Sequence, residues 1–474
     1  MTSAASGFGA RLWRPIDGAW LSAFRTLYGL TMAFGLARFV AYGWLDLFLI
    51  EPQFHFKYWG FGWIEPLPPG MLHALALALA GLGLCVAAGA FFRVSACAFV
   101  IGFSYLELVD VTTYLNHYYL AALLGGLLAL SPAHRNWSVD AWLRARARAR
   151  GQTRPDTSIA AFWLYLLRFQ VGLVYTCAGL AKAQGDWLLH AQPLRIWLGA
   201  RTELPWVGPI LRWDWAAPVM SWLGFAFDLS IALWLSIPKT RPYAFAALVV
   251  FHGLTGMLFP IGLFPVIMVT AALVFFSPSW PRQILARCRA LFGLVPSTLP
   301  LEAEPVPAHR MPGPRARWAL LGASLAYCAV HVVLPLRYLA YPGNVLWHEQ
   351  GMRWSWRVMV REKNGSVSYS VRDRETGHEW QVSPRRYLSR AQEREMSGQP
   401  DLILQLAHHI RDDFRARGHA NVEVRADALV SLNARPMALL IDPTVDLAQI
   451  RDGVSTATWI APMPAQAPLR LRPL

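Results

Sequence analysis

Charged residues are scarce in this 474-residue sequence. Only 15% of the residues are Asp, Glu, Lys or Arg, against roughly a quarter in an ordinary soluble protein, whereas 55% are hydrophobic. The mean hydropathy is +0.31. This composition excludes a disordered chain and a simple cytosolic enzyme, and it favours a polytopic protein of the lipid bilayer.

Cysteines and familiar catalytic motifs are scarce as well. The five cysteines form no CxxC pair and four of them lie in apolar stretches, so a disulfide-stapled secreted domain is excluded. There is no P-loop, no GxGxxG after a strand and no HExxH. We therefore expect no ATP, dinucleotide or zinc chemistry and assign no metal site.

Acidic residues are too few to balance the basic ones, and the net charge is +15. Nucleic acid is not the expected partner, because membrane proteins concentrate Arg and Lys on cytoplasmic loops. Nine apolar stretches are candidates to cross or enter a bilayer. They cover residues 20–42, 70–90, 95–112, 117–131, 159–181, 214–236, 242–257, 261–276 and 318–340.

The loops between these stretches set the expected orientation. With the N-terminus inside, the inner loops hold 17 basic residues and the outer loops five. We therefore expect a cytoplasmic N-terminus and an extracytoplasmic C-terminal part. Residues 1–17 are polar, so no cleavable signal peptide is expected. Frequent Arg and Ala favour a bacterial inner membrane.

Beyond residue 340 the sequence changes character. Residues 341–474 hold 18 basic and 15 acidic residues. Asn364-Gly365 lies between two β-rich runs and predicts a hairpin turn. "EWQVS", "NVEVRA" and "MALLI" are further strand candidates, and residues 401–417 read as an amphipathic helix. The expected fold is a polytopic α-helical membrane domain of about nine transmembrane helices (1–340), followed by a β-rich α+β extramembrane domain (341–474).

Lysine is the rarest basic residue, with only four against forty arginines. Lys182 directly follows the fifth apolar stretch, at its outer end. Its side chain either snorkels to the headgroups or is a desolvated amine that acts as a base. Because arginine cannot lose its proton and lysine can, the choice of lysine favours the base.

Other polar residues lie in or beside the apolar stretches. Asn116 and His117 are expected at the outer mouth of the fourth stretch, level with Lys182, and His252 lies in the seventh. Each histidine is either functional or simply satisfied by a backbone carbonyl. Arg168 and Asp228 are expected to pair with each other for structural reasons.

Two groups of fragments stand out along the sequence. The first is "FFRVSACAFVIGFSYLELVDVTTYLNHYYL", "NWSVDAW", "LLRFQVGLVYTCAGLAKAQGDW" and "FHGLTGMLFPIGLFPVIM", and the second, near the C-terminus, is "WSWRVMVR", "YSVRDRETG" and "DPTVDL". These fragments resemble the vitamin K-dependent γ-glutamyl carboxylase family. They are collinear and extend from about residue 10 to 461. The resemblance does not include the long C-terminal extension of animal members, so propeptide docking is not implied.

The resemblance implies the chemistry of that family. Reduced vitamin K, as phylloquinol or menaquinol, is oxidised by O₂ to its epoxide, and the alkoxide so generated deprotonates a peptidyl Glu, which then adds CO₂. No biotin, ATP or metal takes part. The family lysine of "AGxxKxxxDW" is Lys182, the catalytic base, and its Asn-His pair is Asn116 and His117.

The resemblance also implies binding residues. His117 is catalytic with Lys182, while Asn116, His252 and Arg195 are expected to bind the quinol. Trp354, Ser355 and Trp356 match a segment tied to binding of the substrate Glu, although the residues before them depart from the family pattern. Partners are therefore the bilayer and a protein or peptide that contains Glu.

Two other functions remain open from the sequence. A quinol epoxidase, or another quinol-linked membrane enzyme, that has lost protein carboxylation would explain the divergent segment before Trp354. A membrane scaffold or transporter would tolerate replacement of Lys182 and His117.

Overall fold

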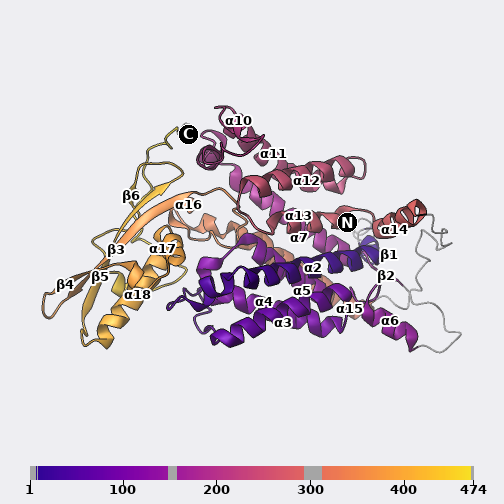
Figure 1. The fold of residues 1–474 in the computed structure, drawn as a ribbon, viewed down its shortest axis with the longest axis horizontal. Coiled ribbons are helices and arrows are strands. Elements are labelled where there is room, and N and C mark those ends of the chain that lie inside the picture. The colour runs from indigo at the N-terminus through magenta and orange to yellow at the C-terminus, as the bar shows by residue number, and fades with distance from the viewer. Residues whose placement is uncertain (1–6, 8, 148–156, 293–311, 471–474) are drawn as a thin grey trace.

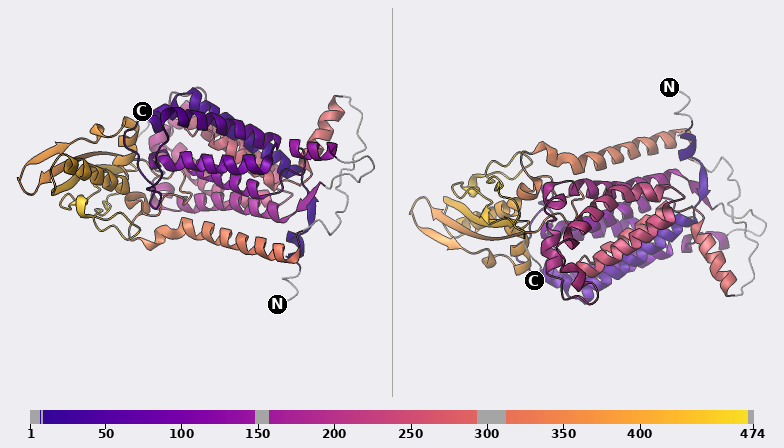
Figure 2. Two further views of the ribbon diagram at one scale, coloured as in Figure 1. Left: turned by 90° about the horizontal axis from the view of Figure 1, so that it is seen from below. Right: turned by 90° about the horizontal axis from the view of Figure 1, so that it is seen from above.

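The computed structural model describes residues 7, 9–147, 157–292 and 312–470. A bundle of long helices occupies one part of the molecule, and a small region of β-sheet and helices lies at one end of it (Figure 1). We call this end of the bundle the sheet end. The N-terminus and helices α6 and α14 lie at the opposite end (Figures 1 and 2).

Each of the nine apolar stretches forms a helix. These helices are α2 (Ala19–Ala41), α3 (Pro69–Ala88), α4 (Phe92–Val109), α5 (Asn116–Leu130), α7 (Phe162–Lys182), α11 (Ala216–Ser236), α12 (Arg241–Leu258), α13 (Phe264–Ala272) and α15 (Pro314–Leu336). The helices outside these stretches include α6 (Val139–Arg146), α8 (Gly185–Leu188), α9 (Leu194–Gly199), α10 (Gly208–Leu211) and α14 (Trp280–Leu291). Strands β1 (Pro15–Asp17) and β2 (Ser158–Ala160) pair at the opposite end.

The prediction of nine membrane spans is not confirmed. Within the described residues, five helices (α3, α4, α7, α11 and α15) are long and apolar enough to cross a membrane. A sixth span is possible if α13 and α14, which are bent by 99°, count as one. Helices α2 and α12 are long enough but less apolar, and α5 has 15 residues.

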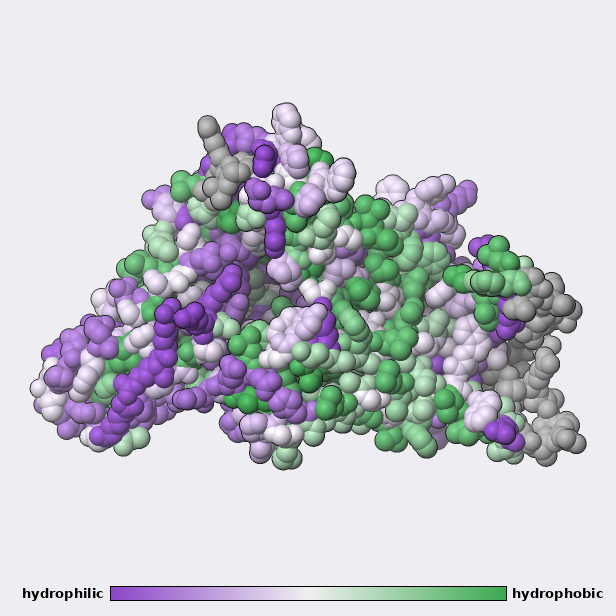
Figure 3. Space-filling view, viewed as in Figure 1, coloured by the Kyte–Doolittle hydropathy of each residue, from purple (hydrophilic) through white to green (hydrophobic). Residues whose placement is uncertain are grey.

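The surface of the bundle agrees with a membrane location. Apolar residues cover its middle in the space-filling view, whereas the sheet region is mostly polar (Figure 3). Helix α15 runs along one side of the bundle (Figure 2) and is only 11% buried. An apolar helix with so little protein contact is suited to lipid rather than water.

Close helix contacts and buried cations hold the bundle together. A Cβ atom on Gly29 would lie 2.5 Å from the backbone nitrogen of Ala87, so glycine allows α2 and α3 to touch. Arg25 is fully buried and donates to the carbonyl oxygens of Ala133 (2.8 Å) and Trp137 (2.7 Å), among others. These bonds satisfy a cation that would otherwise be costly to bury.

The sheet region is a four-stranded antiparallel sheet in the order β4-β3-β5-β6. Its strands are β3 (Lys363–Asp373), β4 (Glu379–Val382), β5 (Val422–Leu432) and β6 (Ala438–Leu439), and its helices are α16 (Val345–His348), α17 (Arg390–Ser397) and α18 (Pro400–Ala416). The buried apolar face of α18 packs on β5. The helix expected at 401–417 and the strands expected in "EWQVS", "NVEVRA" and "MALLI" are confirmed, although β6 has only two residues.

The hairpin predicted at Asn364-Gly365 is wrong. Both residues lie inside β3, where they pair with Ser431 and Val430 of β5. The pairing of β3 with the 11 residues of β5 extends the strand through the expected turn. The chain instead turns between β3 and β4, where Gly377 has a φ of +74°.

Candidate functional site

Three cavities meet where the bundle joins the sheet region. We call them the lysine cavity (about 80 Å³), the junction cavity (about 840 Å³) and the arginine cavity (about 180 Å³). Met359 lines all three, and Val358 and Phe264 line the first two. Residues from both regions therefore share one set of walls.

Lys182 is the last residue of α7 and lines the lysine cavity. Its side chain is buried, and Nζ donates to Oδ2 of Asp228 on α11 at 2.7 Å. Nζ also lies 3.4 Å from the carbonyl oxygens of Ala178 and Val358, and 5.2 Å from the centre of the Trp187 ring. A lysine that snorkels would reach water, whereas this one points into protein.

The expected pair of Arg168 and Asp228 is wrong. Arg168 donates instead to the backbone carbonyls of Val274, Phe275 and Phe276 at 2.8–3.1 Å, where the helical turn after α13 ends. Asp228 pairs with Lys182. Helix-end carbonyls lack intrahelical donors, so they can satisfy an arginine without a carboxylate.

A glycine brings Lys182 and Asp228 together. A Cβ atom on Gly179 would lie 2.7 Å from the backbone nitrogen of Leu229, which follows Asp228. No larger residue fits while α7 and α11 keep this spacing. The "AG" of the lysine motif is therefore a requirement of helix packing.

The "DW" of the same motif fixes the chain just beyond Lys182. Asp186 accepts two hydrogen bonds from Arg435 (2.6 and 2.7 Å) and one from Asn433 (2.9 Å), both of which follow β5. Trp187 donates through Nε1 to the carbonyl of Ser221 on α11 at 2.8 Å. These contacts tie the end of α7 to the sheet region and to α11.

His252 is another lining residue of the lysine cavity. It is buried on α12, and its Nε2 is 2.8 Å from the hydroxyl of Tyr175 on α7. Its Nδ1 is buried without a hydrogen-bond partner. The break between α12 and α13 (residues 259–263) lines the cavities, as expected for irregular backbone inside a bundle.

Asn116 and His117 open α5 and line the junction cavity. Oδ1 of Asn116 accepts a hydrogen bond from the Tyr114 hydroxyl at 2.9 Å. The Phe264 ring lies between the two histidines, 5.7 Å from the His117 ring and 5.6 Å from the His252 ring. The structure thus places Lys182, His252, Asn116 and His117 around adjoining cavities.

Arg195 lies apart from them. It is on α9, where its guanidinium is 3.9 Å from Asp214, and it lines none of the three cavities. Its neighbour Leu194 is the residue that reaches the lysine cavity. The structure therefore gives no support to direct contact between Arg195 and a ligand in these cavities.

Trp354, Ser355 and Trp356 also line none of the three cavities. Trp354 stacks on Tyr58 at 5.7 Å and Trp356 stacks on Tyr119 at 4.9 Å. The Ser355 hydroxyl donates to a backbone carbonyl of the same loop. These side chains hold the loop in place, and the residues on either side of them face the arginine cavity.

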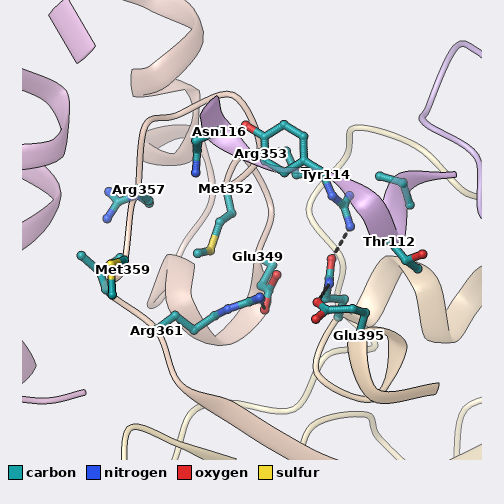
Figure 4. A pocket seen from close by; sticks show the side chains of 13 residues that line it. Thr112, Tyr114, Asn116, Glu349, Met352, Arg353, Arg357, Met359, Arg361 and Glu395 are labelled. Atoms are coloured by element: carbon teal, nitrogen blue, oxygen red, sulfur yellow. Dashed lines mark hydrogen bonds and ion pairs between the residues drawn. The ribbon is translucent and has the colours of Figure 1, made fainter. Parts of the chain in front are cut away.

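The arginine cavity is the polar member of the three. Arg357 and Met359 lie on one side of it, and Thr112 and Glu395 lie on the other, with Glu349 and Arg361 below (Figure 4). Arg361 forms an ion pair with Glu349. Arg357 packs on the Tyr338 ring at 4.0 Å and has no ion pair with any described carboxylate.

Burial shifts the pKa values of groups around this cavity. It raises the pKa of Glu395 and lowers the pKa of Arg357, because both lose the solvation of their charged forms. Burial also lowers the pKa of Lys363 to about 8, although Glu349 acts in the opposite direction. The charged side chains around this cavity are therefore partly removed from water.

Sequence reasoning missed Arg357, Arg361, Glu349 and Arg38. The arginines recur every four residues in "RWSWRVMVR", a signal that the tryptophans obscured. Glu349 has a φ of +59°, and such local geometry cannot be read from sequence. Arg38 lies in the same apolar stretch as Arg25, and nothing in the sequence distinguishes the two arginines.

Two family models match the chain. The HTTM domain matches residues 13–280, and the vitamin K-dependent gamma-carboxylase lumenal domain matches residues 317–466. No solved structure matches. The first match alone covers more than half of the sequence, and the two follow one another along the chain, so this protein belongs to the vitamin K-dependent gamma-carboxylase family.

Proposed function

We propose that the protein is a membrane γ-glutamyl carboxylase that couples oxidation of reduced vitamin K by O₂ to addition of CO₂ to a peptidyl Glu. The observation that carries the proposal is the position of Lys182. Its amine is buried beside Asp228 in an apolar cavity, and that cavity shares Val358 and Met359 with cavities that hold arginines and Asn116.

Lys182 is the proposed base. A lysine amine accepts a proton at Nζ, and the resulting ammonium is stabilised by the Asp228 carboxylate at 2.7 Å. Val174, Phe251 and Phe264 are among the apolar residues that line the cavity and keep water from the amine. Tyr175 orients His252 toward the same space.

The cavities fit a quinol. The lysine and junction cavities are lined mainly by apolar and aromatic residues, and the junction cavity has about 840 Å³. His252 offers a buried Nδ1 without a partner, and Asn116 and His117 offer polar groups. When bound, reduced vitamin K supplies the oxidisable ring whose reaction with O₂ drives Glu deprotonation. Asn116, His117 and His252 would hold its head group, with Lys182 as the proton acceptor.

The arginine cavity is the proposed site for the substrate Glu. Arg357 is a cation without an acidic partner among the described residues, and Arg361 and Arg353 line the same space. A guanidinium binds a carboxylate through paired hydrogen bonds. This assignment moves Glu binding from Trp354, Ser355 and Trp356 to the arginines beside them.

The membrane arrangement belongs to the same proposal. We place residues 1–340 in the membrane domain and residues 341–474 outside it, with a cytoplasmic N-terminus and an extracytoplasmic sheet region. The matched name "lumenal domain" supports this side for the C-terminal part. A bacterial inner membrane fits the composition. The quinol would enter from the bilayer and the Glu peptide from the aqueous side.

The second candidate is a quinol epoxidase without protein carboxylation. It is favoured by Trp354, Ser355 and Trp356, whose side chains pack within the protein and do not reach a cavity. Arg195, which was expected to bind the quinol, adds to neither candidate.

One assay separates the candidates. Membranes with the full chain are given reduced vitamin K, labelled bicarbonate and a Glu peptide. The proposal expects epoxide and labelled peptide from the wild type, whereas epoxide without label would favour the second candidate. Lys182→Ala should lower epoxidation at least ~100-fold, the range of a lost general base, while the protein remains folded. Wild-type rates in that variant would refute the role of Lys182, and no product from the wild type would refute both candidates.

A further inference from the structure

Arg38 lies in the last turn of α2 and lines the junction cavity, which also contains His117. Its guanidinium centre is 5.1 Å from the centre of the Trp44 ring and 6.0 Å from that of Tyr42. A Cβ atom on Gly262 would lie 3.3 Å from one of its terminal nitrogens, so the break between α12 and α13 packs against it.

Arg38 differs from the other arginines of the bundle in its partners. Arg25 and Arg168 donate to several backbone carbonyls. In the described part of the chain, no carboxylate forms an ion pair with Arg38 and no backbone carbonyl accepts a hydrogen bond from it, and its Nε, like that of Arg25, is buried without a hydrogen-bond partner. A cation in a largely apolar cavity is costly unless an opposite charge compensates it.

Other groups with positive potential converge on the same cavity. Helix α5 begins there, and the N-terminus of a helix carries free amide hydrogens and partial positive charge. Oδ1 of Asn116 is already bonded to Tyr114, so its Nδ2 group is the donor that remains. His117 contributes a ring nitrogen from the next position.

We infer that Arg38, Asn116 and His117 form an oxyanion site for the negatively charged ring oxygen of a quinol or hydroxynaphthoquinone. The inference rests on the proposed function, because it takes the junction cavity to hold the quinol. A substrate carboxylate is the other source of an oxyanion. The ring oxygen is favoured because Phe39, Phe48 and Phe264 also line the cavity and suit an aromatic head group.

The test measures binding rather than turnover. The full chain in detergent is titrated with a 3-alkyl-2-hydroxy-1,4-naphthoquinone, which is an anion at neutral pH, and with the neutral 3-alkyl-2-methyl analogue. Arg38→Gln should weaken the anionic probe by at least ~10-fold, as expected for a lost charge-assisted bond, and the neutral probe by less than about twofold. Arg38→Lys should recover part of the loss.

A matched control is Arg146→Gln. Arg146 packs on the Trp142 ring at 4.8 Å, much as Arg38 packs on Trp44, but it lies on α6 at the opposite end of the bundle. Arg146→Gln should leave the affinity for both probes unchanged. If thermal unfolding shows that Arg38→Gln does not fold, Arg38→Lys takes its place. The inference then predicts that Arg38→Lys weakens binding of the anionic probe more than binding of the neutral probe.

Two results would overturn the inference. In one, Arg38→Gln changes both probes equally or neither, which makes Arg38 a structural residue. In the other, it weakens binding of a Glu peptide but not of the anionic naphthoquinone. Failure of the proposed function looks different, because the wild type would then bind the probes with the expected dependence on Arg38 yet form neither epoxide nor labelled peptide.

Discussion

Arg25 and Arg168, at one end of the helical bundle, have different partners from Lys182 and Arg38 at the other end. At the end away from the sheet, Arg25 donates to backbone carbonyls of the loop before α6 and of α3, and Arg168 to those that follow α13. At the sheet end, Lys182 pairs with a carboxylate and Arg38 faces a cavity without one.

The difference separates structural charges from functional ones. A guanidinium bound by several carbonyls holds the ends of helices, and neither Arg25 nor Arg168 lines any of the three cavities. A lysine held by one carboxylate at the wall of a cavity can exchange its proton with a ligand in that cavity. The partner of a buried charge is therefore more informative than its presence.

The largest expected effect comes from breaking the Lys182–Asp228 pair. Asp228→Leu leaves a buried ammonium without its counter-ion and should lower the free energy of unfolding by about 3–5 kcal/mol. The double variant Lys182→Met with Asp228→Leu removes both charges and should recover most of that stability without epoxidation activity. Thermal unfolding in detergent measures both, and a double variant as unstable as the single one would contradict a functional reason for the pair.

At the opposite end, Arg25→Met should affect stability alone. Four backbone carbonyls lose a charged donor, which should cost about 2–4 kcal/mol. Epoxidation per folded molecule should stay at the wild-type level, because Arg25 lines none of the three cavities. A selective loss of turnover with unchanged melting temperature would remove the distinction between the two ends.

A smaller effect is expected in the arginine cavity. Arg357→Gln should raise the KM for a Glu peptide about 10-fold, equivalent to about 1.4 kcal/mol, and leave kcat and the affinity for quinol close to wild type. The control is Arg385→Gln, an exposed arginine of the sheet region that pairs with Glu393. An unchanged KM in Arg357→Gln would direct the search for the carboxylate site to Arg361 or Arg353.

The last prediction concerns Lys363, next to the same cavity, and changes only the pH dependence of stability. Its pKa is lowered to about 8 from 10.5 by burial, so between these values the folded protein binds fewer protons than the unfolded chain. Stability should therefore rise with pH across this window, by at most about 1.4 kcal/mol per pH unit. Lys363→Met should remove this rise when unfolding is followed from pH 7 to 10, and parallel curves for the two proteins would refute the shift.

The positions of helices and strands were easier to predict from the sequence than the contacts between residues far apart in it. Apolar length located nine helices, and period-two and helical patterns located β4, β5 and α18, because each depends on neighbouring residues. The prediction failed where contacts with distant segments determine the structure. Asn364 and Gly365 lie in a strand because β5 pairs with them, and Arg168 donates to carbonyl oxygens more than 100 residues away in the sequence.

The candidate site divides in the same way. Lys182, Asn116, His117 and His252 were identified from local motifs, and the structure brings them to adjoining walls. Whether they act as proposed stays a prediction. Asp228 as the partner of Lys182, and the exposure of Arg357 rather than Trp354 to a cavity, depend on how two helices and a loop pack. No spacing in the sequence encodes either.

The bonds from Asp186 to Arg435 and Asn433 have a mechanical consequence. They join the sheet region to the chain four residues after Lys182, so a movement of the sheet region would also displace the end of α7. A swing of the sheet region to admit a peptide would drag the amine of Lys182 away from Asp228. The loop of residues 349–361 reaches the same amine, because the Val358 carbonyl lies 3.4 Å from Nζ of Lys182, so the lysine is tied to two separate segments of the C-terminal region.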